Sequence, residues 1–200
     1  MLKSLILGAV LGGITLFLWG AVSWMVMPWH MHGMHKFEDE AQVAQVLTEN
    51  APVSGMYLLP NALHVPNRGH PELATKERAD AVARMQRGPY AFVAVTLNGM
   101  DPKKPDHYVN ALAVDVVCAL LVSWLLMQTQ GLGYLRRVWF VTVVGVLIGA
   151  ASALPDWIWW RFSDNFTALG LLDALVGWFL AGIVIARFAT GQRSSLPTFR

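Results

Sequence analysis

The longest apolar run of the sequence extends from Ser4 to Met27 and contains 24 residues, none of them Asp, Glu, Lys or Arg. At about 1.5 Å per residue, a helix of this length measures about 36 Å, which is enough to cross a hydrocarbon core of roughly 30 Å. The run is also much longer than the apolar core of a cleaved signal peptide, which has roughly 7 to 15 residues. We therefore predict a retained membrane-spanning helix here.

Three further apolar stretches of similar length follow, at 108–127, 138–155 and 167–187. The composition agrees, because only 14% of the residues are charged, whereas soluble domains usually have about a quarter. A net charge of +2, without a clustered basic patch, excludes a nucleic-acid partner. The predicted fold class is an α-helical membrane protein, a four-transmembrane-helix bundle with a small α+β extracytoplasmic insert between helices 1 and 2.

The insert is polar and differs in composition from the rest of the chain. Residue periodicity and turn signals predict helices and strands in alternation. A segment this small builds little core of its own, so we expect it to lean on the membrane or on a partner. The expected elements are a helix over 37–50, a strand over 54–60, a loop over 61–71, a helix over 72–87 and a strand over 90–97.

The basic residues near the span ends predict the orientation. Arg136 and Arg137 lie in one short loop, and Arg187 ends the last span, so both segments belong on the cytoplasmic side. Arg193 and Arg200 add to the second group. Both termini are then cytoplasmic and the insert is outside, in a chain whose size and tight loops suit a bacterial inner membrane. The predicted domains are 1–35 (first span and collar), 36–107 (insert), 108–190 (three-helix region) and 191–200 (cytoplasmic tail).

Methionine and histidine gather where the first span ends, in the sequence SWMVMPWHMHGMH at 23–35. If the helix continues past Pro28, several of these side chains share one face at spacings of four, seven and eight. Thioether and imidazole are ligands that Cu(I) prefers, so copper is a possible cofactor. The alternative is an interfacial collar of Met and Trp, with the histidines facing headgroups. The candidate metal ligands are Met27, His30, Met31, His32, Met34 and His35.

Two acids lie inside predicted spans. Asp115 and Asp173 are each about six residues into a span, which predicts matching depths, and their faces carry small residues that suit contact with other helices. A carboxylate there needs a partner, and Arg161, Asn110 and His30 are available. The pair either moves protons or cations, or holds the bundle together by hydrogen bonds.

The last outer loop, 156–166, contains the remaining polar candidates. Asp156 continues a stripe of small and polar residues on the third span, and Arg161 follows three tryptophans. Such an arginine can bind a lipid headgroup or a quinone-like ring, but an aromatic belt with a snorkelling Arg explains the same residues, so no ligand is assigned.

No sequence motif of nucleophilic, metallopeptidase or nucleotide chemistry is present, and Cys118 is the single cysteine, so no intramolecular disulfide can form. The leading expectation is a non-enzymatic accessory, assembly or interaction subunit that docks through its insert. The alternatives are a copper-handling protein and a small proton-coupled carrier. The expected partners are the lipid bilayer and another membrane protein or further copies of the chain.

Overall fold

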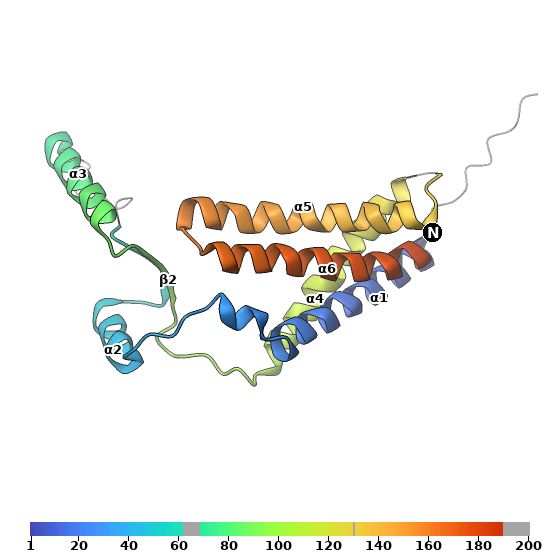
Figure 1. Ribbon diagram of the computed structural model, residues 1–200, viewed down its shortest axis with the longest axis horizontal. Coiled ribbons are helices and arrows are strands. Elements are labelled where there is room, and N and C mark those ends of the chain that lie inside the picture. Colours follow the sequence, from blue (N-terminus) through green and yellow to red (C-terminus); the bar gives the residue numbers. More distant parts are fainter. Residues whose placement is uncertain (62–68, 130, 190–200) are drawn as a thin grey trace, which may run out of the picture. The chain divides into compact units, whose positions relative to one another are not determined.

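A computed structural model describes residues 1–61, 69–129 and 131–189 (Figure 1). The chain is mostly helical, with four helices long and apolar enough to cross a membrane and a small two-stranded sheet. Each predicted span overlaps one of these helices, so the number and order of the long apolar helices agree with the prediction. The candidate spans are Leu2–Val26, Pro105–Gln128, Tyr134–Trp160 and Asp164–Phe188.

The chain divides into two compact units. One contains Met1–His35 together with Pro102–Arg200, and the other is the insert, Lys36–Asp101. The insert ends earlier than the predicted position 107 because a helix begins at Pro105, where a proline suits the first helical turn. The predicted tail 191–200 lies outside the described residues.

The four-helix unit has two central and two outer helices. The first span is helix α1 (Leu2–Ala21) with a following π-helical turn (Val22–Val26), and the others are α4 (Pro105–Gln128), α5 (Tyr134–Trp160) and α6 (Asp164–Phe188). Helix α1 packs along both α4 and α6, and α5 packs along α6 (Figure 1). Helices α1 and α6 are therefore central, whereas α4 and α5 each keep a long face open.

Glycines permit the close approach of these helices. A Cβ atom at Gly12 of α1 would lie 2.6 Å from Cγ1 of Ile185 in α6, and one at Gly145 of α5 would lie 1.9 Å from Cγ of Trp178 in α6. Neither position can accept a larger residue unless the helices separate. The glycine-containing face of α1 is thus a helix-packing face, as small-residue faces of membrane helices commonly are.

The apolar core lies toward the end of the bundle where the chain begins. Its fully buried members include Val122 and Leu126 of α4, Val141 of α5 and Ile185 of α6. At this end the guanidinium of Arg137 donates a hydrogen bond from Nη2 to the carbonyl of Ala189. The arginine therefore caps the C-terminus of α6, where a cation is favourable.

The insert contains α2 (Glu40–Asn50), β1 (Gly55–Leu59), α3 (Pro71–Arg87) and β2 (Ala91–Val95). This is the predicted order of elements, with shorter strands. The strands pair antiparallel, from Gly55 opposite Val95 to Leu59 opposite Ala91. Of the predicted loop 61–71, residues 62–68 lie outside the described part of the chain.

The insert has almost no core within its described residues. Its two strands are the elements that pack extensively, and neither α2 nor α3 lies along the sheet. Helix α2 buries no residue, and α3 buries only Ala81. A two-stranded sheet alone is marginally stable, and the expectation that this segment leans on the membrane or on a partner stays a prediction.

Candidate functional site

The first span ends in a reversal of the chain at Met27 and Pro28. Met27 is extended, with φ −84° and ψ 132°, and a 3₁₀ turn covers Pro28–His32. Proline has no N–H for a helical hydrogen bond and pushes the preceding residue into the extended region, which explains the break. The methionine and histidine side chains were predicted to share one face only if the helix continued past Pro28. Because the α-helix ends before it, that face does not form.

The reversal brings His30 back against the last turn of the first span. Nε2 of His30 lies 2.9 Å from Oγ of Ser23, and the indole Nε1 of Trp29 donates to the same hydroxyl at 3.1 Å. Ser23 is fully buried and His30 is 5% exposed. His30 thus lies inside the protein and does not face headgroups, contrary to the alternative prediction.

Asp173 of α6 completes this group of side chains. Its carboxylate Oδ2 lies 3.8 Å from Nε2 of His30, and its Oδ1 accepts a 2.6 Å hydrogen bond from the indole Nε1 of Trp19. Trp19 also reaches the backbone carbonyl of Asp173, at 3.2 Å. Of the partners that sequence reasoning offered for the intramembrane acids, His30 is the one that the structure places beside Asp173.

Aromatic rings enclose the histidine. The Trp24 ring stacks on the imidazole, with centroids 3.9 Å apart and an interplanar angle of 4°, and Trp29 meets it edge-on at 5.8 Å. Trp19 and Trp29 are also in edge contact, at 6.0 Å. We name the whole group the His30 cluster; it comprises Trp19, Ser23, Trp24, Trp29, His30 and Asp173.

Gly177 makes the position of Trp19 possible. It lies one helical turn after Asp173 on α6, and a Cβ atom there would come within 2.8 Å of Cδ1 of Trp19. The tryptophan therefore lies flat enough on α6 for its indole N–H to reach the carboxylate. Gly33 makes a similar close approach to Phe166, since a Cβ at Gly33 would lie 3.3 Å from the Phe166 Cα.

The polar contacts of the His30 cluster join two parts of the four-helix unit, and we call these contacts the clasp. The Ser23 hydroxyl is hydrogen-bonded to the imidazole and to the Trp29 indole, and the Asp173 carboxylate accepts from the Trp19 indole and lies 3.8 Å from the imidazole. Buried polar groups paired in this way hold elements in one arrangement. The clasp joins the segment that leaves the first span to the middle of α6. It fixes the last residues of this unit before the insert begins at Lys36.

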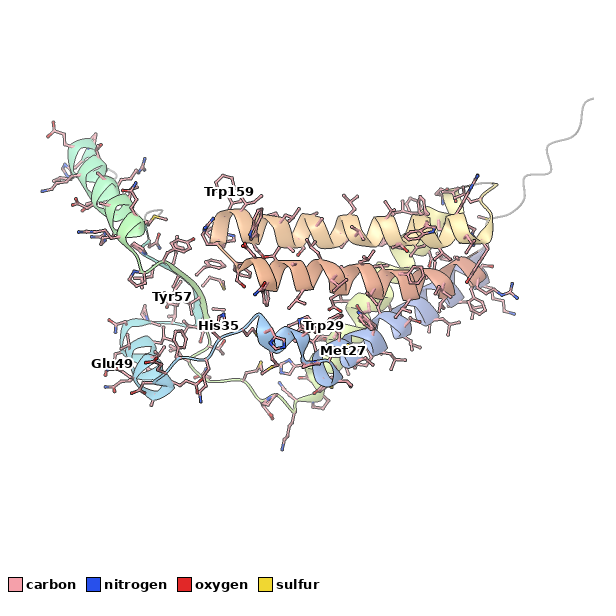
Figure 2. The ribbon with its side chains drawn as sticks, in the orientation of Figure 1. Met27, Trp29, His35, Glu49, Tyr57 and Trp159 are labelled. Atoms are coloured by element: carbon pink, nitrogen blue, oxygen red, sulfur yellow. The ribbon has the colours of Figure 1, made fainter. Side chains whose placement is uncertain are left out.

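The other candidate metal ligands lie at the surface. Met27, Met31 and Met34 are exposed, with Met31 at 71%, and His32 and His35 are exposed as well. Figure 2 labels Met27 and His35, the first and last of these residues. Within residues 1–61, 69–129 and 131–189, no three His, Cys, Asp or Glu side chains form a group that could hold a metal ion. A copper site in this segment would therefore have to use methionine sulfur.

Asp115 differs from Asp173 in its surroundings. It is half-buried on α4, and its carboxylate makes no hydrogen bond or ion pair in the described part of the chain. Its neighbour Val116 lies against Gly13, whereas Asp173 is bonded to Trp19, six positions further along α1. The two acids thus lie beside different levels of α1, because α4 and α6 are staggered against it. Their matching depth in a membrane stays a prediction.

Asp156 and Arg161 have backbone roles. Helix α5 continues past Pro155 to Trp160, and Arg161 ends it in the left-handed conformation with φ 60°. The carbonyl of Asp156 accepts hydrogen bonds from the N–H groups of Arg161 and Phe162. The turn into α6 is further fixed by the indole of Trp157, which donates to Asp164 at 2.7 Å.

Sequence reasoning identified His30 and Asp173 but did not connect Ser23 or Trp19 to them. Both lie on the first span, Trp19 in α1 and Ser23 in the turn that follows it. A polar hydroxyl and an indole N–H on an apolar span were the available signal, because each needs a hydrogen-bond partner when it is buried.

No protein-family model, curated protein or solved structure matches the chain.

Proposed function

We propose that this chain is a membrane-anchored accessory subunit that acts through protein interactions, with the insert Lys36–Asp101 as its docking part. The observation that carries this proposal is the number of large apolar side chains that the insert leaves exposed. They lie on both helices, on both sides of the sheet and in the connecting segments. They are Phe37, Val46, Val53, Met56, Leu59, Leu73, Val82, Leu97 and Met100.

A partner protein would supply what the insert lacks. The sheet has two strands, so the outer edge of each one presents backbone N–H and C=O groups that another strand can pair with. Burial of exposed side chains such as Met56, at 60%, and Val53, at 65%, would add apolar contact. Such a role requires no catalysis.

The charge distribution supports an orientation for the insert. Lys3, Arg136, Arg137 and Arg187 lie at one end of the four-helix unit, which we name the basic end, and no described residue there is acidic. The opposite end carries both signs, including Asp106 and Asp164. By the positive-inside rule the basic end is cytoplasmic, and the insert then lies outside, in a bacterial inner membrane.

The clasp contributes to docking by limiting how the chain leaves the membrane. Because His30 is held against Ser23 and Asp173, the segment before Lys36 starts from a fixed point on α6. A fixed starting point reduces the conformational entropy that binding removes, which favours association.

Site-specific photo-crosslinking tests this proposal. A photoreactive amino acid at Val46 or Met56, in the full chain in its native membrane, is expected to link to another protein. The same residue at the exposed Lys76 of α3 is the control for a polar surface. Links from the control position alone, or no links at all, would contradict the proposal. Links only between two copies of the chain would replace the partner by a homo-oligomer.

Copper handling is a second candidate, and the exposure of the methionine sulfurs favours it. Met27, Met31 and Met34 lie within eight residues and are accessible from outside the helix bundle. Thioether ligands select Cu(I) among the common metals. We propose that any such site uses these methionines with His32 and His35, while His30 belongs to the clasp.

A further inference from the structure

Asp115 lies well inside a candidate span and has no hydrogen bond or ion pair to its carboxylate among the described residues. It lies ten residues after Pro105, about 15 Å along α4, and therefore near the middle of a 24-residue span. Asp173, in contrast, is held by Trp19 and His30. One intramembrane acid thus has partners among the described residues, and the other has none there.

An unpaired carboxylate in a membrane span is costly, and such residues usually face a protein or a water-filled cavity. The candidate spans, all within the described part of the chain, offer no basic group at the level of Asp115. Every Lys, Arg and His within the four candidate spans lies among the first or last four residues of its span. These residues are Lys3, His107, Arg136, Arg137 and Arg187. A second copy of the chain would have the same limitation.

The face of α4 beside Asp115 is open to another helix. Helix α4 is an outer helix that packs mainly along α1. Val114, Val117 and Leu121 around the acid are more than half exposed, whereas Ala119, one turn after Asp115, is fully buried. Asp115 is therefore at the border between the packed side of α4 and its open side.

We infer that a transmembrane helix of the partner protein docks along the open side of α4 and presents a lysine or arginine to the Asp115 carboxylate. The charge complementarity identifies the partner: a membrane protein with one basic side chain near the middle of a span. Pairing of the two charges removes the cost that each would have alone in lipid. This inference rests on the proposed function and adds a second contact, inside the membrane, to docking through the insert.

A defined peptide tests the inference. The full chain is reconstituted in phosphatidylcholine vesicles with a synthetic leucine–alanine transmembrane peptide that carries one central lysine. A matched peptide has leucine at that position. Energy transfer between labelled protein and peptide is expected to show at least about tenfold stronger association with the lysine peptide, which corresponds to about 1.4 kcal/mol. Equal association of the two peptides would overturn the inference, and this comparison needs no variant of the protein.

Variants then locate the contact. D115N is expected to reduce association with the lysine peptide to the level of the leucine peptide, while D115E retains it. D106N, on the same helix but near its first residue, is the control and is expected to bind like the original chain. Unchanged association in D115N would overturn the inference, as would self-association through α4 that depends on Asp115. Since crosslinking from Met56 reports docking through the insert separately, failure here leaves that result unaffected.

Discussion

Trp19 and Asp173 lie 154 positions apart and are joined by a 2.6 Å hydrogen bond from the indole N–H to the carboxylate. This bond links the first span to the last one, near the end of the bundle opposite the basic end. There the polar and aromatic contacts of the His30 cluster adjoin the apolar core, which Ala174 and Leu16 still reach. The position of the segment before the insert therefore depends on a few side chains.

Removal of the Trp19 hydrogen bond should weaken the bundle. W19F keeps an aromatic ring but leaves the carboxylate without this donor, and we expect a loss of about 0.5 to 2 kcal/mol of stability. Unfolding of the purified protein by denaturing detergent measures the change. W124F is the control, because Trp124 is an exposed residue on the outer helix α4. An equal effect of both substitutions would mean that the bond contributes nothing specific.

The α5–α6 pair should be sensitive to added volume at one glycine. In G145A the new methyl group would overlap the Trp178 ring, so the helices must separate, at a cost of about 1 to 3 kcal/mol. G170A on α6 is matched to it, because no atom lies within 4 Å of a Cβ at that position. Thermal stability in detergent should fall for G145A alone. A loss of similar size in both variants would show that helix packing is not the cause.

The clasp should protect the backbone amides of the segment after the first span from hydrogen exchange. H30A removes the ring that joins Ser23 to Asp173, so hydrogen exchange over residues 27–35 should become faster. H32A, only two positions away and exposed, should leave exchange unchanged. If H30A exchanges as slowly as the original chain, the His30 cluster does not hold this segment.

The copper hypothesis predicts binding that depends on the exposed methionines and not on His30. Competition with a Cu(I)-specific chelator measures the affinity. We expect a loss of binding in the double variant M31A/M34A, and also on replacement of His35, since thioether and imidazole are the available ligands. H30A should retain binding. Unaltered binding in M31A/M34A would remove the copper hypothesis for this segment.

Much of the fold follows from local patterns in the sequence. Long apolar runs give the four long helices, and alternating turn and strand signals give the order of elements in the insert. The third span was predicted to end at Pro155, but α5 continues to Trp160. A proline removes only one backbone hydrogen bond, so a helix can continue past it.

The site was less predictable because it depends on contacts between distant residues. In a continuous α-helix, the backbones of Ser23 and His30 would lie about 10 Å apart along the axis, which is two turns. The reversal at Pro28 instead brings Oγ of Ser23 and Nε2 of His30 to 2.9 Å. The levels of Asp115 and Asp173 depend on how α4 and α6 are staggered along α1. Neither the reversal nor the stagger has a periodic signal in the sequence.

The central claim is that the insert lies on the opposite side of the membrane from the basic end. Single cysteines at Met56 in the insert and at Leu132 in the short loop before α5, in a chain where Cys118 is replaced by alanine, test it directly. A membrane-impermeant maleimide added to intact cells should label the cysteine at 56 and reach the one at 132 only after the membrane is opened. Labelling of position 132 in intact cells, with position 56 protected, would contradict the orientation and the docking role built on it.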